Sequence, residues 1–88
     1  MQKRNYILKS VNGLSSRLSC NLVSFANRFN SLIILHYDGE EANLKSIMNV
    51  MALVIQNNEP FAISCTGDDE EEAINSIDNY LKNLDIIA

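Results

Sequence analysis

The sequence predicts an α+β fold, a two-layer domain in which helices cover one face of a mainly antiparallel four-stranded sheet. Three observations lead to this prediction. The expected elements follow one another in the order β-α-β-β-α-β-α. The two middle strands are joined by Asp38-Gly39, a dipeptide preferred in tight hairpins because both central residues need positive φ. No linker or low-complexity segment interrupts the 88 residues, so we expect a single domain over residues 1–88.

The first half of the chain is predicted to form a strand, a helix and a hairpin. A short apolar run at residues 6–8 indicates the strand, which Asn12-Gly13 ends. Ser15 or Ser16 can cap the helix, which we expect to run to about residue 29. The helix has an apolar stripe at helical spacing, formed by Leu18, Leu22, Phe25 and Phe29. Residues 32–37 are typical of a buried strand, and residues 40–43 of a short polar edge strand.

The second half is predicted to hold a helix, a strand and a longer helix. The first of these helices begins after Ser46, whose hydroxyl can accept from free N–H groups of the first turn. Residues 61–66 alternate between large apolar and small or polar side chains, as in a strand with one buried face. Residues 69–84 are predicted to form the last helix. Acidic residues lie in its first turn and Lys82 in its last turn, which suits the helix macrodipole.

The helix after Ser46 is apolar nearly all round, which a short helix in a small domain can bury only in part. One face should enter the core, and the other should remain as an exposed patch that contains Met48 and Met51. Such a patch suggests docking to a partner, with Ser46 at its edge. A capped core helix with a few exposed methionines explains the same pattern, and the sequence favours neither interpretation.

Composition narrows the function classes. The net charge of −4 disfavours non-specific binding to nucleic acid, which needs a basic footprint. No apolar run is long enough to cross a membrane, and residues 1–5 lead straight into a strand without the pattern of a signal peptide. We therefore expect a cytoplasmic protein with no membrane partner. In that compartment Cys20 and Cys65 should be reduced, and the default expectation for both is a small buried side chain.

The candidate chemical groups are sparse. His36 lies inside a strand without a second ligand at metal spacing, so we expect a structural role, no metal site and no cofactor. The acidic run at residues 68–72 lacks the spaced ligands of a calcium loop. The loop Asn12-Gly13 leads into a helix start, where Arg17 could help to hold an anion, although an ordinary turn explains it equally well. Ser15 has no adjacent base that would make it a nucleophile.

Two motifs resemble those of phosphocarrier HPr of the bacterial sugar phosphotransferase system, over residues 6–84. The segment Lys45-Ser46-Ile47-Met48-Asn49-Val50-Met51-Ala52-Leu53 matches the second family signature closely, with asparagine where glycine is usual. The first signature, Gly-Leu-His-Ala-Arg-Pro, is half kept: Gly13, Leu14 and Arg17 match, while Ser15 replaces the phosphorylated histidine. A serine ester lacks the transfer potential of a phosphoramidate. The resemblance therefore favours the Crh branch, the catabolite-repression relatives of HPr.

The resemblance implies an open-faced sandwich with strand order 1-4-2-3 and three helices on one face of the sheet. It implies a non-enzymatic regulatory protein that HPr kinase/phosphorylase modifies on Ser46 and that then docks a LacI-type regulator such as CcpA. A divergent phosphocarrier that accepts phosphate from enzyme I is the alternative. Crh relatives occur as monomers or strand-exchanged dimers. The partner contacts implied by position are Arg17, Cys20, Asn21, Ser24, Ile47, Met48 and Met51.

Overall fold

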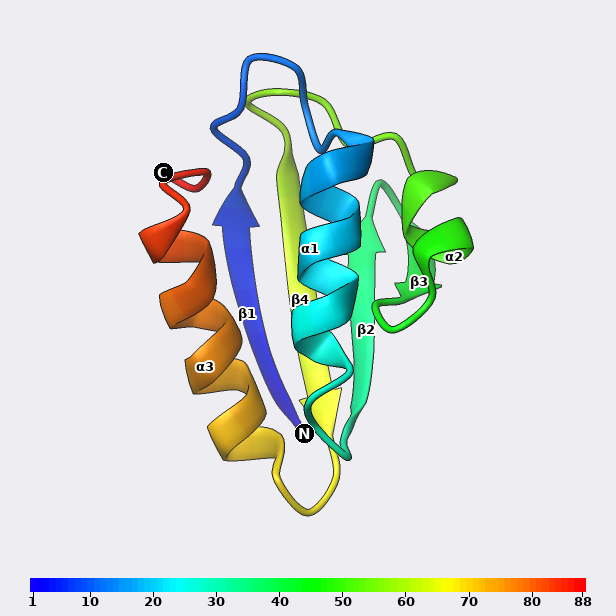
Figure 1. The fold of residues 1–88 in the computed structure, drawn as a ribbon, viewed down its shortest axis with the longest axis vertical. Helices are drawn as coiled ribbons and strands as arrows, with labels where there is room; N and C mark the ends of the chain where they lie inside the picture. Colours follow the sequence, from blue (N-terminus) through cyan, green and yellow to red (C-terminus); the bar gives the residue numbers. More distant parts are fainter.

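A computed structural model describes all 88 residues and has the predicted two-layer α+β architecture (Figure 1). The strands form one sheet in the order β1-β4-β2-β3, and every neighbouring pair is antiparallel. The strands are β1 (Gln2–Ile7), β2 (Leu32–Tyr37), β3 (Glu40–Asn43) and β4 (Pro60–Thr66). The helices are α1 (Ser16–Ala26), α2 (Ile47–Met51) and α3 (Glu70–Asn83). Both the predicted element order and the strand order that the family resemblance implied are confirmed.

The core lies between the helices and one face of the sheet. Alternate side chains of β2 and β4 point into it, so Ile33, Leu35 and Ile63 are completely buried. Each helix contributes side chains to the same cluster, for example Leu22 from α1, Val50 from α2 and Ile77 from α3. The other face of the sheet carries no helix. This one-sided arrangement leaves α1 and α2 with solvent-facing surfaces next to each other (Figure 1).

The β2–β3 hairpin has the predicted turn. Asp38 and Gly39 have φ values of 51° and 78°, the positive values that the two central residues of such a turn require. His36, which the sequence assigned a structural role, lies in β2 and pairs with Glu41 of β3 and Ala62 of β4.

Two predicted boundaries were wrong, and the structure adds the end of α2, which was not predicted from the sequence. β1 begins at Gln2 and not at residue 6, because its polar first half pairs with β4 although it lacks an apolar pattern. α1 ends at Ala26, since Asn27 closes it with a backbone N–H donated to Val23 and Phe25 carbonyls. α2 ends at Met51, and the chain turns soon afterwards at Val54, which has a φ of 51°.

The expectation for the cysteines was wrong for one of the two. Cys65 of β4 is fully buried, but Cys20 of α1 is exposed, and both are free thiols. Burial, followed by the nearby charges of Asp69 and Glu70, raises the pKa of the Cys65 thiol to about 11.

The Asp69 side chain joins two connections between helices and strands. The Asp69 carboxylate, just before α3, accepts from the backbone N–H groups of Asn30 (2.8 Å) and Ser31 (2.9 Å) and from the Ser31 hydroxyl. These three donors, the hydroxyl first, hold the pKa of Asp69 below its usual range. The α1–β2 connection is thereby tied to the β4–α3 connection.

Candidate functional site

Ser46 caps α2, as the sequence predicted. Its backbone is extended, and its Oγ accepts from the Asn49 N–H at 3.4 Å. The side chain is half-buried, and Ile47 and Met48 follow it directly on the first turn of α2. The Ser46 hydroxyl therefore lies at the boundary between the α2 backbone and the solvent-facing side of the helix.

The two faces of α2 differ sharply in exposure. Val50 is 1% exposed and belongs to the core, whereas Met48 is 81% exposed and Met51 46% exposed. Met48 and Met51 are therefore exposed, as both interpretations of the sequence predicted. Exposed methionines next to one another are flexible and polarizable, which suits a surface that adapts to a partner.

The residue next to Ser46 is anchored to the end of α1. Lys45 donates from Nζ to the Phe29 carbonyl at 2.6 Å, and its own carbonyl accepts from the Asn27 side-chain amide at 3.2 Å. The same amide also donates to the Val23 carbonyl at 2.9 Å. Lys45 and Asn27 thus hold the start of α2 beside the C-terminal end of α1. Sequence reasoning missed both roles, because the acceptors are backbone carbonyls without a side-chain signature.

The residues implied as partner contacts lie on these two helices. On α1, Arg17, Asn21 and Ser24 follow at helical spacing, and all three are exposed, as is Cys20. On α2, Met48 and Met51 are exposed and Ile47 is half-buried. We call this set, together with Ser46, the α1–α2 surface. None of its α1 side chains forms a hydrogen bond or an ion pair within the chain.

Ser15 occupies the start of α1 in a similar way. Its Oγ accepts from the Leu18 N–H at 3.3 Å. The preceding Gly13 has a φ of 69°, and a Cβ at this position would lie 2.5 Å from the Ile55 carbonyl oxygen. No histidine or carboxylate bonds to Ser15, because the only histidine, His36, binds Ser64 and Glu41 instead. Ser15 is therefore a helix cap without the base that would activate it as a nucleophile.

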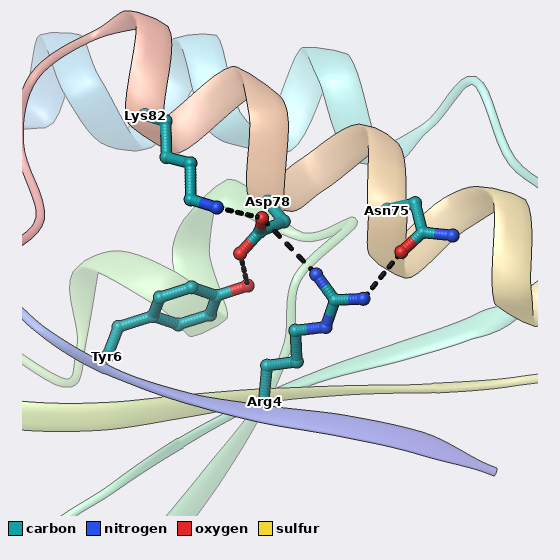
Figure 2. Close-up of polar contacts among 5 residues, drawn as sticks. All are labelled: Arg4, Tyr6, Asn75, Asp78 and Lys82. Atoms are coloured by element: carbon teal, nitrogen blue, oxygen red, sulfur yellow. Dashed lines mark hydrogen bonds and ion pairs between the residues drawn. The ribbon is translucent and has the colours of Figure 1, made fainter.

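A charged network on the other side of the molecule was also missed. Asp78 of α3 is 7% exposed and accepts from the Tyr6 hydroxyl at 3.1 Å. Its carboxylate also pairs with Lys82 at 2.8 Å and Arg4 at 3.2 Å, and Arg4 donates in turn to Asn75 (Figure 2). The sequence carried one visible signal, the i,i+4 spacing of Asp78 and Lys82.

The network shifts the pKa values of two of its members, Asp78 and Tyr6. The Lys82 ammonium, with smaller effects from Tyr6 and Arg4, holds the pKa of Asp78 below its usual range despite partial desolvation. Burial, together with the hydrogen bond to Asp78, raises the pKa of Tyr6 far above that of a free phenol. These groups are mutually satisfied, so the network joins β1 to α3 and leaves no free group for a ligand.

Two further kinds of site, a metal centre and a membrane-spanning helix, are absent from the structure. No three side chains of the types His, Cys, Asp or Glu come together as a metal site would require. None of the helices combines the length and the apolar character that crossing a bilayer demands.

The β-α-β-β-α-β-α order and the β1-β4-β2-β3 sheet are those that the family resemblance implied, and comparison with known proteins agrees. Residues 2–83 match the family model described as the PTS HPr component phosphorylation site. The chain belongs to the HPr family.

Three solved structures illustrate the similarity. The histidine-containing phosphocarrier protein of a mycoplasma is 32% identical, with 98% of each chain covered and a TM-score of 0.93. Phosphocarrier protein HPr from Bacillus anthracis is 34% identical, with 90% of this chain and 94% of that chain covered and a TM-score of 0.82. The catabolite repression protein Crh of Bacillus subtilis, a swapped dimer, is 31% identical, with 94% and 95% covered and a TM-score of 0.73.

Proposed function

We propose that this chain is a non-catalytic regulatory protein, switched by phosphorylation of Ser46 and acting through its α1–α2 surface. One observation carries the proposal: Ser46 caps α2 directly beside Met48, which is 81% exposed, while position 15 holds a serine without a base. A phosphate on Ser46 would form an ester and would stay where it is placed. The modification would change the net charge from −4 to about −6 beside an apolar patch.

The charge and the patch together define the partner. A docking surface for the phosphorylated chain needs arginines or lysines for the phosphate beside an apolar groove for Met48 and Met51. A LacI-type transcription regulator of the CcpA kind, with the phosphorylated chain as its corepressor, fits the Crh-like pattern of a lost histidine and a kept serine. The modifying enzyme would be an HPr kinase/phosphorylase, and the setting carbon catabolite control in the cytoplasm.

The first test is phosphorylation in vitro. The chain is incubated with HPr kinase/phosphorylase and ATP, and the phosphate is located by peptide mass spectrometry. We expect one phosphate on Ser46 and none on Ser46→Ala, whereas Ser15→Ala should be modified like the parent chain. A chain that takes no phosphate while an ordinary HPr in the same reaction does would refute the proposal.

The second test is docking. Binding of the phosphorylated chain to a CcpA-type regulator is measured by calorimetry and compared with the unmodified chain. We expect binding only after phosphorylation, and its loss when Arg17 is replaced by alanine, because Arg17 is exposed and unpaired on the neighbouring helix. Equal binding of the two forms would show that Ser46 is no switch.

A divergent phosphocarrier is the second candidate. It is supported by the family model, described as the PTS HPr component phosphorylation site, and by the similarity to phosphocarrier proteins. Enzyme I and phosphoenolpyruvate distinguish the two functions: acid-labile phosphate on the chain would support the carrier, and its absence the regulator. Because a serine ester is acid-stable, a stable phosphate on Ser15 would identify an acceptor that does not pass the group on.

A further inference from the structure

The uncovered face of the sheet brings together three side chains that no part of the proposed function uses. His36 of β2 stands opposite Ala62 of β4 on one side and Glu41 of β3 on the other. Ser64 lies two residues along β4 from Ala62 and therefore on the same face as His36. This face looks away from α1, α2 and the core.

The three side chains form a hydrogen-bonded row. His36 Nε2 lies 2.8 Å from Ser64 Oγ, and His36 Nδ1 lies 3.4 Å from Glu41 Oε2. An ionised carboxylate only accepts, so Glu41 selects the imidazole tautomer that carries its proton on Nδ1. Nε2 then accepts from the Ser64 hydroxyl. A hydroxyl, a base that accepts its proton and a carboxylate that orients the base are the parts of an activated nucleophile.

A shallow hollow of about 250 Å³ lies beside this row. Lys3, Asn5, His36 and Ala62 are among the residues that line it, whereas Ser64, which is 6% exposed, is not one of them. Lys3 pairs with Ser64 across the β1–β4 ladder and forms no ion pair, so its ammonium is free to face negative charge that develops next to Ser64. The hollow is shallow and open to solvent, so the burial of Ser64, and not the volume of the hollow, favours a small acyl group.

We propose that Ser64 is a nucleophile that His36 activates to take the acyl group of a small activated ester bound against His36, at the edge of this hollow. The Ser64 oxygen attacks the ester carbonyl carbon and forms a new C–O bond, while the hydroxyl proton passes to His36 Nε2. The bond to the leaving alkoxide or phenolate breaks, and Ser64 keeps the acyl group as an ester. Electron pairs and protons balance without an oxidant or a metal. The site lies away from the α1–α2 surface and does not depend on the function proposed for it.

The test uses the full chain and p-nitrophenyl acetate as the probe. We expect one equivalent of p-nitrophenolate per chain in a burst, with the acetyl group on Ser64 in peptide mass spectra. Hydroxylamine should remove this ester but leave any acetyl amide on a lysine. Ser64→Ala should abolish the burst. His36→Ala should slow acetylation of Ser64 on the order of 100-fold, the lower range for general-base catalysis. Added imidazole should restore part of this acetylation, which is followed by mass spectrometry because imidazole itself cleaves p-nitrophenyl acetate.

Control variants keep the result interpretable. Thr66, on the same strand and face but without an imidazole partner, should remain unlabelled, and Thr66→Ala should react like the parent chain. Circular dichroism checks that each variant keeps its fold. If His36→Ala misfolds, Glu41→Gln replaces it, with a smaller decrease in rate expected because the carboxylate is itself exposed. Acetylation of lysines alone, labelling spread over the other eight serines, or a burst unchanged in a folded His36 or Glu41 variant would each overturn the proposal.

Discussion

The α3–β1 contact and the α1–α2 surface use polar side chains in opposite ways. At the α3–β1 contact, Asp78 is buried and both of its oxygens have partners from Tyr6, Arg4 and Lys82. On the α1–α2 surface, the exposed polar side chains of α1 have no partner within the chain, and large apolar side chains lie beside them. Satisfied buried groups stabilise a fold, whereas unsatisfied exposed groups are available to another molecule. Substitutions on the two sides should therefore have different consequences.

A large loss of stability is expected from Asp78→Asn. This change leaves Arg4 and Lys82 without their carboxylate and weakens the bond from the Tyr6 hydroxyl. We expect a loss of about 1.5–3 kcal/mol, the range for hydrogen bonds to charged groups, nearer its lower end because Arg4 and Lys82 are themselves well exposed. Urea unfolding measures the change. Asp68→Asn is the matched control, since Asp68 is exposed and unpaired, and it should change stability by less than about 0.5 kcal/mol.

The Asp78 contribution should also depend on pH. Because the pKa of Asp78 is lowered in the folded protein, its carboxylate stabilises the fold above the unfolded value of about 3.9. That stabilisation is lost as the pH falls through the lower folded value. The difference between the parent chain and Asp78→Asn should be constant between about pH 7 and 5 and shrink below about pH 4. A difference that stays constant down to pH 2 would mean that the ion pairs do not carry it.

The same contrast explains what the sequence could predict. Apolar patterns, turn residues and charges indicated the existence and order of the elements. The helix caps and the hairpin turn could be predicted because they depend on neighbouring residues such as Ser46 and Asp38-Gly39. The exposure of Met48 followed from counting apolar positions around one short helix. These features are local, so one sequence contains the information that fixes them.

Interactions between residues that are far apart in the sequence could not be predicted from it. Tyr6 and Asp78 are separated by 72 positions, and each looks ordinary where it stands. The first half of β1 has no apolar alternation, so only its partner β4 defines it. Lys45 binds a backbone carbonyl, which any residue could supply. The contacts of His36 with Ser64 and Glu41 were missed, because these two residues come from two other strands and only the strand register brings them together.

A smaller effect, a gain of stability, is expected from a substitution at Val54 in the connection between α2 and β4. Val54 is β-branched, 62% exposed and held at a φ of 51°, a conformation that costs an L-residue about 1–2 kcal/mol. Val54→Gly removes that strain but gives the unfolded chain more freedom, worth about 0.4–1 kcal/mol. We expect a net gain of roughly 0.5–1 kcal/mol in urea unfolding. Val11→Gly is the control, since Val11 is 90% exposed without a positive φ and should only lose stability.

The smallest effect on stability, together with a clear effect on docking, is expected from Met48→Ala. The side chain is 81% exposed, so its removal takes little apolar surface out of the core and should change stability by less than about 0.5 kcal/mol. Val50→Ala, two residues along the same helix and fully buried, should cost about 1–2.5 kcal/mol instead.

Partner binding should rank the same two variants in the opposite order, with Met48→Ala affected more than Val50→Ala. If the α1–α2 surface binds a partner after phosphorylation, Met48→Ala should weaken that binding more than about fivefold, as loss of a contact worth over 1 kcal/mol does. Folded Val50→Ala should bind nearly like the parent chain, because Val50 touches the core and not the solvent. Phosphorylation of both variants is checked first, so that weaker docking cannot come from a poorer kinase substrate. Unchanged docking of phosphorylated Met48→Ala would remove the methionine patch from the interface and leave the polar face of α1 to carry it.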